Sequence, residues 1–478
     1  MIDGYIEKDI LRQIKVVEYL FELKRLNIPK VAELLNVNQM TIKRDIEKIL
    51  LLDSRIQLVE KKSIHVTVYF QVGVTRYKLI RKLYSQSYFL KTCLLYLQGE
   101  RNYIKISEQE HISVAKVFSL KQKVEEFFKK IGGMTEEGEF IKDEFQYRLL
   151  LLTIWMRVES LELKFDQRVY REAKKIVCKI RDVFSNELNE REDYFFTLNV
   201  YLSLQRKHMR IKNPKQGMEY LYKESVSEKI ETIVHSYQLP KNESDYLTIM
   251  YRLLNHNLTN YHYFQIDYYQ LRKKHFYEKP EILSLVHRFE QMFHRELMKE
   301  ILFERALLRF LVDIFYHRYM YLVEKNHFIE VPQRQLCTQV RQLMSEWSQE
   351  YGYKVYLEDR AIESFCLKVT DILIGQEFKK LYVFIVAENE FSQVIYREHI
   401  QRRLNTKQIV INNELYYSLE TLPMYLDKEN SVILCERSLT NIPFETYQEI
   451  KMFPVSLFSV NEDLQRFFMY VINKKERI

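Results

Sequence analysis

Close to the N-terminus, apolar residues recur at the spacing of two short helices joined by a tight turn. We expect the first helix at Pro29–Leu35, the turn at Asn36–Asn38 and the second helix at Gln39–Leu50. Asn36 suits a positive φ, and Asn38 suits the cap of the second helix. The apolar positions that would form the core are Val31, Leu34, Leu35, Val37, Ile42, Ile46 and Ile49. This pattern is typical of a helix-turn-helix.

The polar side of the second helix is rich in hydrogen-bond donors. Its members are Gln39, Thr41, Lys43, Arg44 and Lys48. Such side chains contact base edges and phosphates when a recognition helix enters the major groove of DNA. The alternative interpretation is an ordinary helical hairpin with a solvated outer face. Turn, spacing and polar side agree, so we predict DNA binding.

The elements on either side of this pair strengthen the prediction. An amphipathic helix is expected over Glu7–Asn27. After Leu52 the period changes, and Ile56–Val59 and Ile64–Val68 are expected as two strands of a β-hairpin. Lys61 and Lys62 lie at the turn of this hairpin, so we expect them to contact the DNA backbone beside the groove.

A second helix-turn-helix is predicted further along the chain. Long and short helices are expected at Arg76–Gln98 and Ile104–Glu110, followed by a recognition helix at Val114–Ile131 that Ser113 would cap. Met134–Ile141 would form a small wing. Lys116, Lys121 and Lys123 are the candidate DNA contacts on this helix. A lone basic helix is usually a solvated face, but two tandem units are a stronger signal than one.

The remainder of the chain contains two helical stretches and a final stretch in which strands and helices alternate. The first helical stretch is broken at Asn213-Pro214 and Leu239-Pro240. The helices expected in the second are Ile282–Leu297, Ile301–Val323, Gln333–Glu350 and Arg360–Ile374. The final stretch predicts a small parallel α/β domain. Its expected strands are Lys380–Val386, Gln408–Asn412, Ser431–Cys435 and Val455–Ser459, and its expected helices are Phe391–Leu404, Tyr417–Leu426 and Glu462–Asn473.

Composition narrows the class of protein. The 478 residues are too many for one core, and only 9 Gly and 8 Pro favour a mostly helical chain. The net charge is +8, and residues 76–130 hold 12 Lys and Arg against 5 Asp and Glu, a surplus of 7. Five scattered cysteines suit a reducing cytoplasm rather than disulfides or zinc. No signal peptide or membrane-spanning run is recognisable, so we expect a cytoplasmic protein without membrane contact.

The junction before the first helical stretch carries a family resemblance. Lys142–Arg148, with an acidic pair and an Arg, runs into an apolar helix that ends at Trp155. This resembles the Mga/AtxA-type global virulence regulators of Gram-positive bacteria, many of them activators. The resemblance implies a mainly α multidomain fold with tandem winged helix-turn-helix domains, two regulatory domains similar to those of phosphotransferase-system regulators (PRDs), and a C-terminal domain similar to a sugar-transport enzyme IIB. The implied domains are residues 1–72, 73–143, 144–277, 278–378 and 379–478.

The resemblance also implies chemistry that the residues only partly supply. An enzyme IIB holds its phospho-accepting residue in the loop after the first strand, but here that loop, Ala387–Glu390, has no Cys or His. Cys435 follows a different strand and is expected to be a buried small hydrophobe. PRDs are regulated by phosphorylation on His, for which His208 and His317 are the candidates. We therefore expect no enzyme, no metal and no cofactor.

These expectations together predict a regulator of transcription that binds double-stranded DNA. It would form a homodimer through the C-terminal domain and the PRD-like bundles, and a phosphocarrier of the phosphotransferase system is a further expected partner. One alternative is an RNA-binding antiterminator, which would begin with a small β-rich domain that is missing here. The other is a phosphotransfer component with a working IIB centre, which the loop Ala387–Glu390 disfavours.

Overall fold

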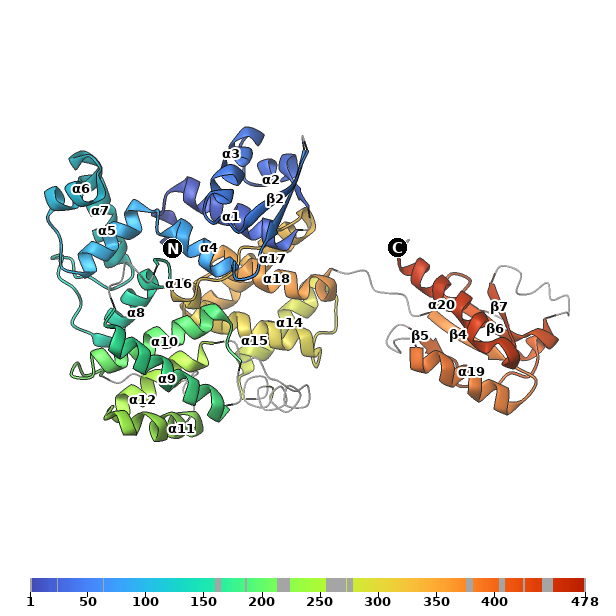
Figure 1. Ribbon diagram of the computed structural model, residues 1–478. Helices are drawn as coiled ribbons and strands as arrows, with labels where there is room; N and C mark the ends of the chain where they lie inside the picture. The colour runs from blue at the N-terminus through green and yellow to red at the C-terminus, as the bar shows by residue number, and fades with distance from the viewer. Residues whose placement is uncertain are drawn as a thin grey trace. The chain divides into compact units, whose positions relative to one another are not determined.

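The computed structural model divides the chain into two units, Met1–Leu373 and Ile374–Ile478 (Figure 1). The part Met1–Leu373 is mainly helical, and the C-terminal unit, Ile374–Ile478, contains a small parallel sheet. None of the helices described is long and apolar enough to cross a membrane. The structure describes residues 2–23, 25–62, 64–159, 165–184, 187–212, 224–254, 272, 278–374, 381–403, 409–423, 426–440 and 450–476.

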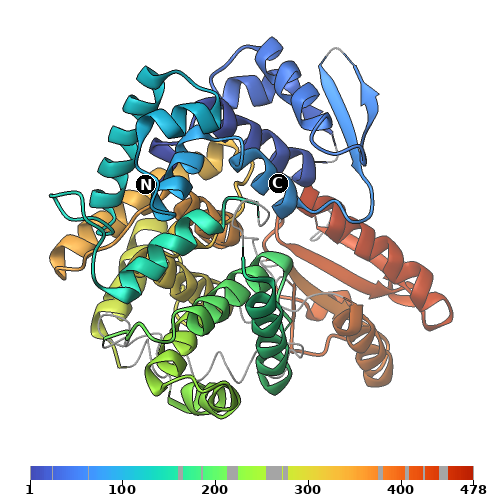
Figure 2. The same cartoon turned by 60° about the vertical axis from the view of Figure 1, so that its left-hand side comes forward.

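The N-terminal elements form a winged helix-turn-helix, here called the winged unit. Its helices are α1 (Lys8–Glu22), α2 (Ile28–Leu34) and α3 (Gln39–Leu50), and its strands are β1 (Leu26–Asn27), β2 (Ile56–Lys61) and β3 (His65–Phe70). The strands form one antiparallel sheet in the order β1-β3-β2. Figure 2 shows the hairpin of β2 and β3 projecting beside the helices. The predicted helix-turn-helix and wing are therefore confirmed.

The turn and the preceding helix show where the prediction held and where it failed. Asn36 has a φ of 50°, and the Asn38 side chain accepts a hydrogen bond from the Thr41 N–H at 2.7 Å, as expected. A single helix over residues 7–27 is wrong, because α1 ends at Glu22. Residues Leu26–Asn27 instead pair with β3 and complete the sheet, a long-range contact that overrides the local helical pattern.

The second helix-turn-helix, here called the second unit, is built from shorter helices. They are α4 (Arg76–Tyr84), α5 (Tyr88–Leu97), α6 (Tyr103–Glu110) and α7 (Val114–Lys130). A single helix over residues 76–98 is wrong. Ser87 caps α5 through the Leu90 N–H, and Glu7 accepts a hydrogen bond from the Ser87 hydroxyl at 2.5 Å, so a partner distant in sequence fixes the break. One bridge between Met134 and Phe140 is all that represents the predicted small wing within the described residues.

The next helices complete the part Met1–Leu373. They are α8 (Glu144–Trp155), α9 (Gln167–Phe184), α10 (Glu190–Gln205), α11 (Glu224–Val234), α12 (Lys241–Arg252), α14 (Pro280–Phe293), α15 (Ile301–Phe315), α16 (Arg318–Tyr321), α17 (Val331–Glu350) and α18 (Asp359–Leu373). One predicted helix over residues 301–323 is wrong, because His317 adopts a φ of 52° and separates α15 from α16. The predicted boundary near residue 277 lies outside the described residues.

The C-terminal unit has four parallel strands in the order β5-β4-β6-β7. The strands are β4 (Leu381–Val386), β5 (Ile409–Ile411), β6 (Ser431–Glu436) and β7 (Lys451–Val455). Helices α19 (Glu390–Arg403) and α20 (Val460–Glu476) pack on one face of the sheet, around Val383, Ile385 and Val432. Tyr416, Leu419 and Leu422 cover the other face. The predicted small parallel sheet is present.

Two predicted elements of this unit are wrong within the described residues. The helix expected from Tyr417 is reduced to one turn, Leu419–Thr421, because this segment lies against the sheet instead of standing as a separate helix. The strand expected at residues 455–459 is not formed. There the chain turns to start α20, and Asp463 accepts hydrogen bonds from the Ser456 N–H at 3.1 Å and the Ser459 hydroxyl at 2.7 Å.

Candidate nucleic-acid interface

Helix α3, the candidate recognition helix, is held by a partly buried ion pair. Arg12 of α1 contacts Asp45 of α3 through two hydrogen bonds, at 2.5 Å and 3.2 Å. The Asp45 side chain is 3% exposed and that of Arg12 21% exposed. A bidentate contact of this kind fixes the angle between two helices as well as their distance. It therefore sets the orientation in which α3 presents its outer side.

The predicted base and phosphate contacts on α3 are not equally placed. Gln39, Arg44 and Lys48 are exposed, whereas Thr41 and Lys43 are half-buried. The Thr41 hydroxyl donates to Asn38 at 2.9 Å, so its first role is in the helix cap. Exposed donors with long side chains are the ones that reach base edges and phosphates. Arg44 and Lys48 are consequently the best placed of the five.

Two apolar residues on the same side of the helix were missed by the sequence analysis. Met40 is 56% exposed, and Leu51, just after the helix, is 86% exposed. At 100° per residue, both lie within half a turn of Arg44 on the outer side of α3. Apolar side chains at such positions contact the methyl group of thymine in the major groove. The sequence could have indicated their exposure, since neither Met40 nor Leu51 stands at one of the apolar positions expected to form the core.

The wing places its basic residues less favourably. The side chain of Lys61 lies outside the described part of the chain. Lys62 is exposed, but its ammonium lies 2.6 Å from Glu60, which Arg25 also approaches at 3.6 Å. These exposed pairs are weak, so a phosphate can replace the carboxylate as the partner of Lys62. The wing residues Val59 and Ile64 are also exposed.

In the second unit, the candidate lysines flank an apolar centre. Lys116 and Lys123 are exposed, but the Lys116 ammonium lies 3.9 Å from the ring centroid of Tyr88. Lys121 is half-buried and lies 3.9 Å from Glu125. Phe118, in the middle of the outer side, is 57% exposed. The turn repeats the geometry of the first, since His111 has a φ of 52° and Ser113 caps α7.

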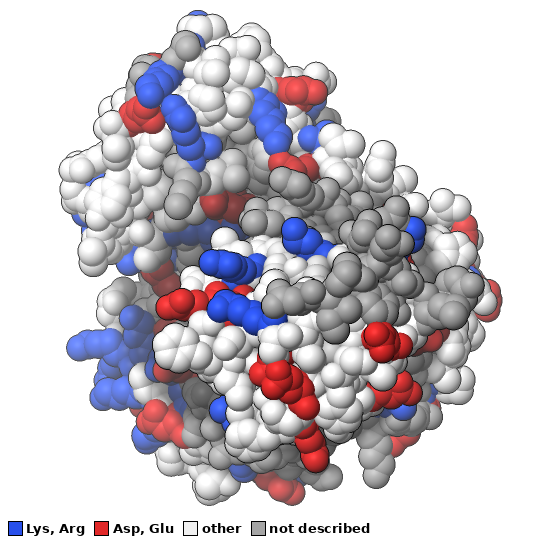
Figure 3. All heavy atoms as spheres, turned by 90° about the vertical axis from the view of Figure 1, so that its right-hand side faces the viewer, with Lys and Arg blue, Asp and Glu red and all other residues white. Residues whose placement is uncertain are grey.

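Charge does not gather into one uninterrupted patch on the face drawn in Figure 3. There, Lys and Arg side chains form several separate groups among uncharged and acidic residues. Independently of that face, contact with a polyanion depends on which cations a DNA-binding element presents, more than on the net charge of +8.

An extended segment holds the winged unit against the later helices. Residues 323–330, here called the strap, run from α16 to α17 along α1. The Asn326 N–H donates to Glu18 at 3.1 Å, and the Phe328 N–H donates to Glu22 at 3.1 Å. The strap also pairs Glu330 with Lys30 of α2 at 2.6 Å. The first helix-turn-helix is therefore not free of the helical bundles in this structure.

The motif that carries the family resemblance is a buried ion network. Arg148 is fully buried and contacts Glu144 at 2.9 Å and Glu243 at 2.7 Å, while Arg206 contacts Glu144 at 2.7 Å. Burial raises the pKa of Glu144, but the hydrogen bonds from Arg206 and Arg148 outweigh it, and the net shift is downward. The network joins α8, α10 and α12, so its role is structural.

The two candidate phosphorylation sites differ in access. His208 is exposed. His317 lies at the start of α16, its ring stacked on Tyr356 at 4.0 Å, with its Nε2 2.8 Å from Glu358. Burial opposes ionisation of Glu358, but the hydrogen bond with His317 lowers its pKa to about 2. Phosphorylation of that nitrogen would break the hydrogen bond between His317 and Glu358.

The loop Ala387–Glu390, which the sequence analysis compared with the phosphate-binding loop of an enzyme IIB, makes hydrogen bonds within the protein itself. The Glu388 N–H donates to the Glu436 carboxylate at 2.8 Å. Asn389 accepts a hydrogen bond from the Ser392 N–H at 2.9 Å and so caps α19. Cys435 is fully buried, and burial raises the pKa of its thiol to about 11. The expected small hydrophobe at this position is confirmed.

Comparison with known proteins supports one part of the chain. A family model described as a DeoR-like helix-turn-helix domain matches residues 12–51. No curated protein matches the sequence. The matched segment runs from Arg12, the ion-pair partner of α3, to Leu51 just past the recognition helix. The chain therefore carries a DeoR-like helix-turn-helix DNA-binding domain at its N-terminus, within a mainly helical multidomain protein.

Proposed function

We propose that the protein is a transcriptional regulator that binds double-stranded DNA through the winged unit. The observation that carries the proposal is the match of residues 12–51 to a DNA-binding domain, on a segment whose recognition helix exposes Gln39, Arg44 and Lys48. Helix α3 enters the major groove, and Lys62 of the wing contacts the neighbouring backbone. The exposed methyl groups of Met40 and Leu51 favour sites that contain thymine.

Electrophoretic mobility shift over a salt series tests this function. Arg44→Gln combined with Lys48→Gln should weaken binding to every duplex by about 10- to 100-fold and reduce the salt slope by about 2. The control is Lys8→Gln on α1, an exposed lysine outside α3, which should bind like wild type. Unchanged binding by the double variant would exclude α3 as the reader, and an absence of binding by the wild type to any duplex would refute the function.

The finer proposal follows the Mga/AtxA-like resemblance. The winged unit and the second unit are taken as residues 1–72 and 73–143, and two PRD-like bundles and an enzyme IIB-like domain follow them. Gene expression would then respond to the phosphotransferase system through a phosphocarrier, and His208 is the better acceptor because it is exposed. A bacterial two-plasmid reporter comparing His208→Ala and His208→Asp variants tests this link, since only a phosphorylation site should separate the two.

We also propose a homodimer without enzymatic activity. The C-terminal unit exposes Phe391 and Phe458, 72% and 100% accessible, and large exposed apolar side chains favour burial against a partner. A dimer would place several DNA-binding elements along one duplex. The absence of phosphotransfer rests on the loop at Glu388, whose N–H group is already bonded to Glu436. Sedimentation of Phe458→Ser tests the dimer.

A further inference from the structure

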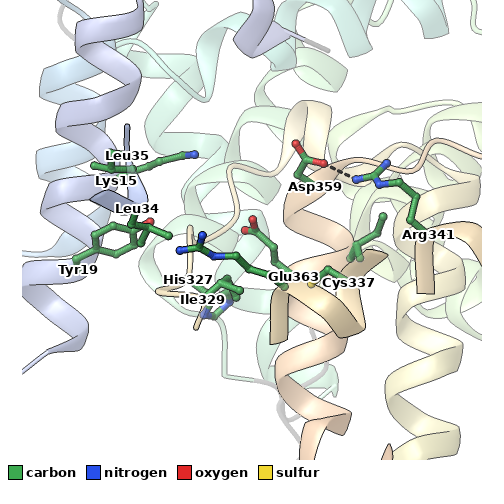
Figure 4. Close-up of a pocket in the computed structure, with 12 residues that line it drawn as sticks. Lys15, Tyr19, Leu34, Leu35, His327, Ile329, Cys337, Arg341, Asp359 and Glu363 are labelled. Carbon is green, nitrogen blue, oxygen red and sulfur yellow. Dashed lines mark hydrogen bonds and ion pairs between the residues drawn. The ribbon is translucent and has the colours of Figure 1, made fainter. Parts of the chain in front are cut away.

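A cavity of about 300 Å³ lies between the winged unit and the helices α17 and α18 (Figure 4). Its walls come from α1, α2, the strap, α17 and α18. Leu34 and Leu35 of α2, Ile329 of the strap and Ile362 of α18 supply apolar surface. This volume lies at the lower end of the range for small-molecule sites.

The cations of the cavity are only partly neutralised by the protein. Arg341 is paired with Asp359, as Figure 4 shows. Among the described residues, no ion-pair or hydrogen-bond partner lies within reach of the ammonium of Lys15 or the guanidinium of Arg334. These two groups belong to two different helices that line the cavity, α1 and α17. An oxyanion between them would receive charge-assisted hydrogen bonds from both.

The third group is a carboxylate that faces the same space. Glu363 of α18 is half-buried, and within the described part of the chain its side chain has no hydrogen-bond partner. Figure 4 shows its carboxylate directed toward Lys15 and the interior of the cavity. Burial raises the pKa of Glu363, which Lys15 opposes. A half-buried carboxylate without a hydrogen-bond partner is costly, and a ligand with a donor group would relieve that cost.

Tyr19 and His327 complete the polar lining. Tyr19 is 3% exposed, and burial raises the pKa of its phenol, which therefore stays protonated as a donor. Burial lowers the pKa of His327, so the imidazole is mainly neutral at neutral pH and adds no third free cation. Among the described residues, the lining thus combines two cations without an ion-pair partner, the carboxylate of Glu363, the Arg341–Asp359 ion pair and a short apolar wall.

We propose that this cavity binds a small metabolite that carries a carboxylate or phosphate group at one end and an ammonium or hydroxyl group at the other. Lys15 and Arg334 hold the oxyanion, Glu363 accepts from the donor group, and Leu34 and Ile362 contact the carbon chain between them. Since the oxyanion touches both α1 and α17, the bound ligand joins the winged unit to the later helices. An effect on DNA affinity rests on the proposed function; binding itself does not.

Calorimetric titration of the full chain, without DNA, tests the site. The probes are β-alanine and phosphoethanolamine, which pair an ammonium with a carboxylate or a phosphate, and propionate and inorganic phosphate, which lack the ammonium. At least one ammonium-bearing probe should bind more tightly than its matched anion, and the tighter of the two identifies the oxyanion. If no probe binds, or if matched anions bind equally well, the proposal is overturned.

Three variants separate the site from general electrostatics. Arg334→Gln and Lys15→Gln should each weaken binding by at least about tenfold. Lys8→Gln, an exposed lysine on the same helix as Lys15 but outside the cavity, should leave it unchanged. Glu363→Gln should strengthen binding of inorganic phosphate and abolish the advantage of the ammonium-bearing probes. Equal binding by all variants would overturn the assignment, and the opposite signs expected for Glu363→Gln exclude misfolding as the cause.

Discussion

The winged unit and the second unit share one turn geometry but differ in how the recognition helix is fixed. Each turn has a residue at a φ near 50°, Asn36 or His111, and each following helix has a side-chain cap. In the winged unit a partly buried ion pair holds α3 to α1. In the second unit, Tyr96 of α5 donates one hydrogen bond to Glu125 of α7 at 3.1 Å. The same local pattern thus supports two different degrees of constraint.

Only the winged unit has a full sheet beside its recognition helix. There β1 closes a three-stranded sheet, whereas the second unit has one bridge between Met134 and Phe140. The outer sides are similar in kind, because α3 exposes Arg44, Lys48 and Met40 and α7 exposes Lys116, Lys123 and Phe118. The sheet beside the recognition helix is therefore what distinguishes the winged unit from the second unit.

The largest expected difference in stability concerns the Arg12–Asp45 contact of the winged unit and the Tyr96–Glu125 contact of the second unit. Asp45→Ala removes a charged, bidentate pair and should destabilise the packing of α3 by about 2–3 kcal/mol, whereas Tyr96→Phe removes one hydrogen bond and should cost about 1 kcal/mol. Hydrogen exchange of the α3 and α7 amides measures both locally. A double-mutant cycle with Arg12→Ala isolates the pair, and Glu33→Ala, at an exposed position on α2, is the control. Equal losses in the two units would remove the proposed contrast.

The caps should differ by a smaller amount. Asn38 accepts at 2.7 Å from a backbone N–H and at 2.9 Å from the Thr41 hydroxyl, while Ser113 accepts one bond at 3.3 Å. We expect Asn38→Ala to cost about 1–2 kcal/mol and Ser113→Ala about 0.5–1 kcal/mol. The two losses of stability are measured by urea denaturation of each variant. Hydrogen exchange of the first-turn amides then assigns each loss to its helix. A larger loss for Ser113→Ala would contradict the distances.

The smallest effect concerns the turn residues and has the opposite sign. Histidine tolerates a positive φ less well than asparagine, and glycine tolerates it best. His111→Gly should therefore stabilise the second unit by about 0.5 kcal/mol, and Asn36→Gly should be close to neutral, because added freedom of the unfolded chain offsets part of the gain. Thermal unfolding of both variants decides the order. Destabilisation by His111→Gly would show that its side chain makes a contact that the turn needs.

The sequence predicted local geometry well and long-range pairing poorly. The positive φ at Asn36, the cap at Asn38 and the hairpin of β2 and β3 follow from residues close in sequence, and all three are present. The third strand of the wing was missed, because Leu26–Asn27 is defined only by its partner on β3.

The same physical reason explains the missed breaks and the missed cavity. The end of α4 depends on Glu7, eighty residues before Ser87. Arg334 and Lys15 are exposed charged residues that the sequence analysis did not single out, since nothing local in the sequence indicates that α1 and α17 line one cavity. Of the predicted DNA contacts, Arg44 and Lys48 are favoured by their exposure. Thr41 instead belongs to the helix cap, a role that the spacing of residues along the sequence did not indicate.

The hydrogen bond from the Asn326 N–H to Glu18 spans 308 residues of sequence. A nascent chain exposes α1 early, yet the strap that receives it emerges about 15–60 s later at ordinary rates of translation. During that interval Glu18 has its partner Arg76 but not Asn326. A newly made chain would thus pass through a period in which the DNA-reading helices have folded without the contacts that restrain them. Docking of the strap then adds the hydrogen bonds to Glu18 and Glu22 of α1.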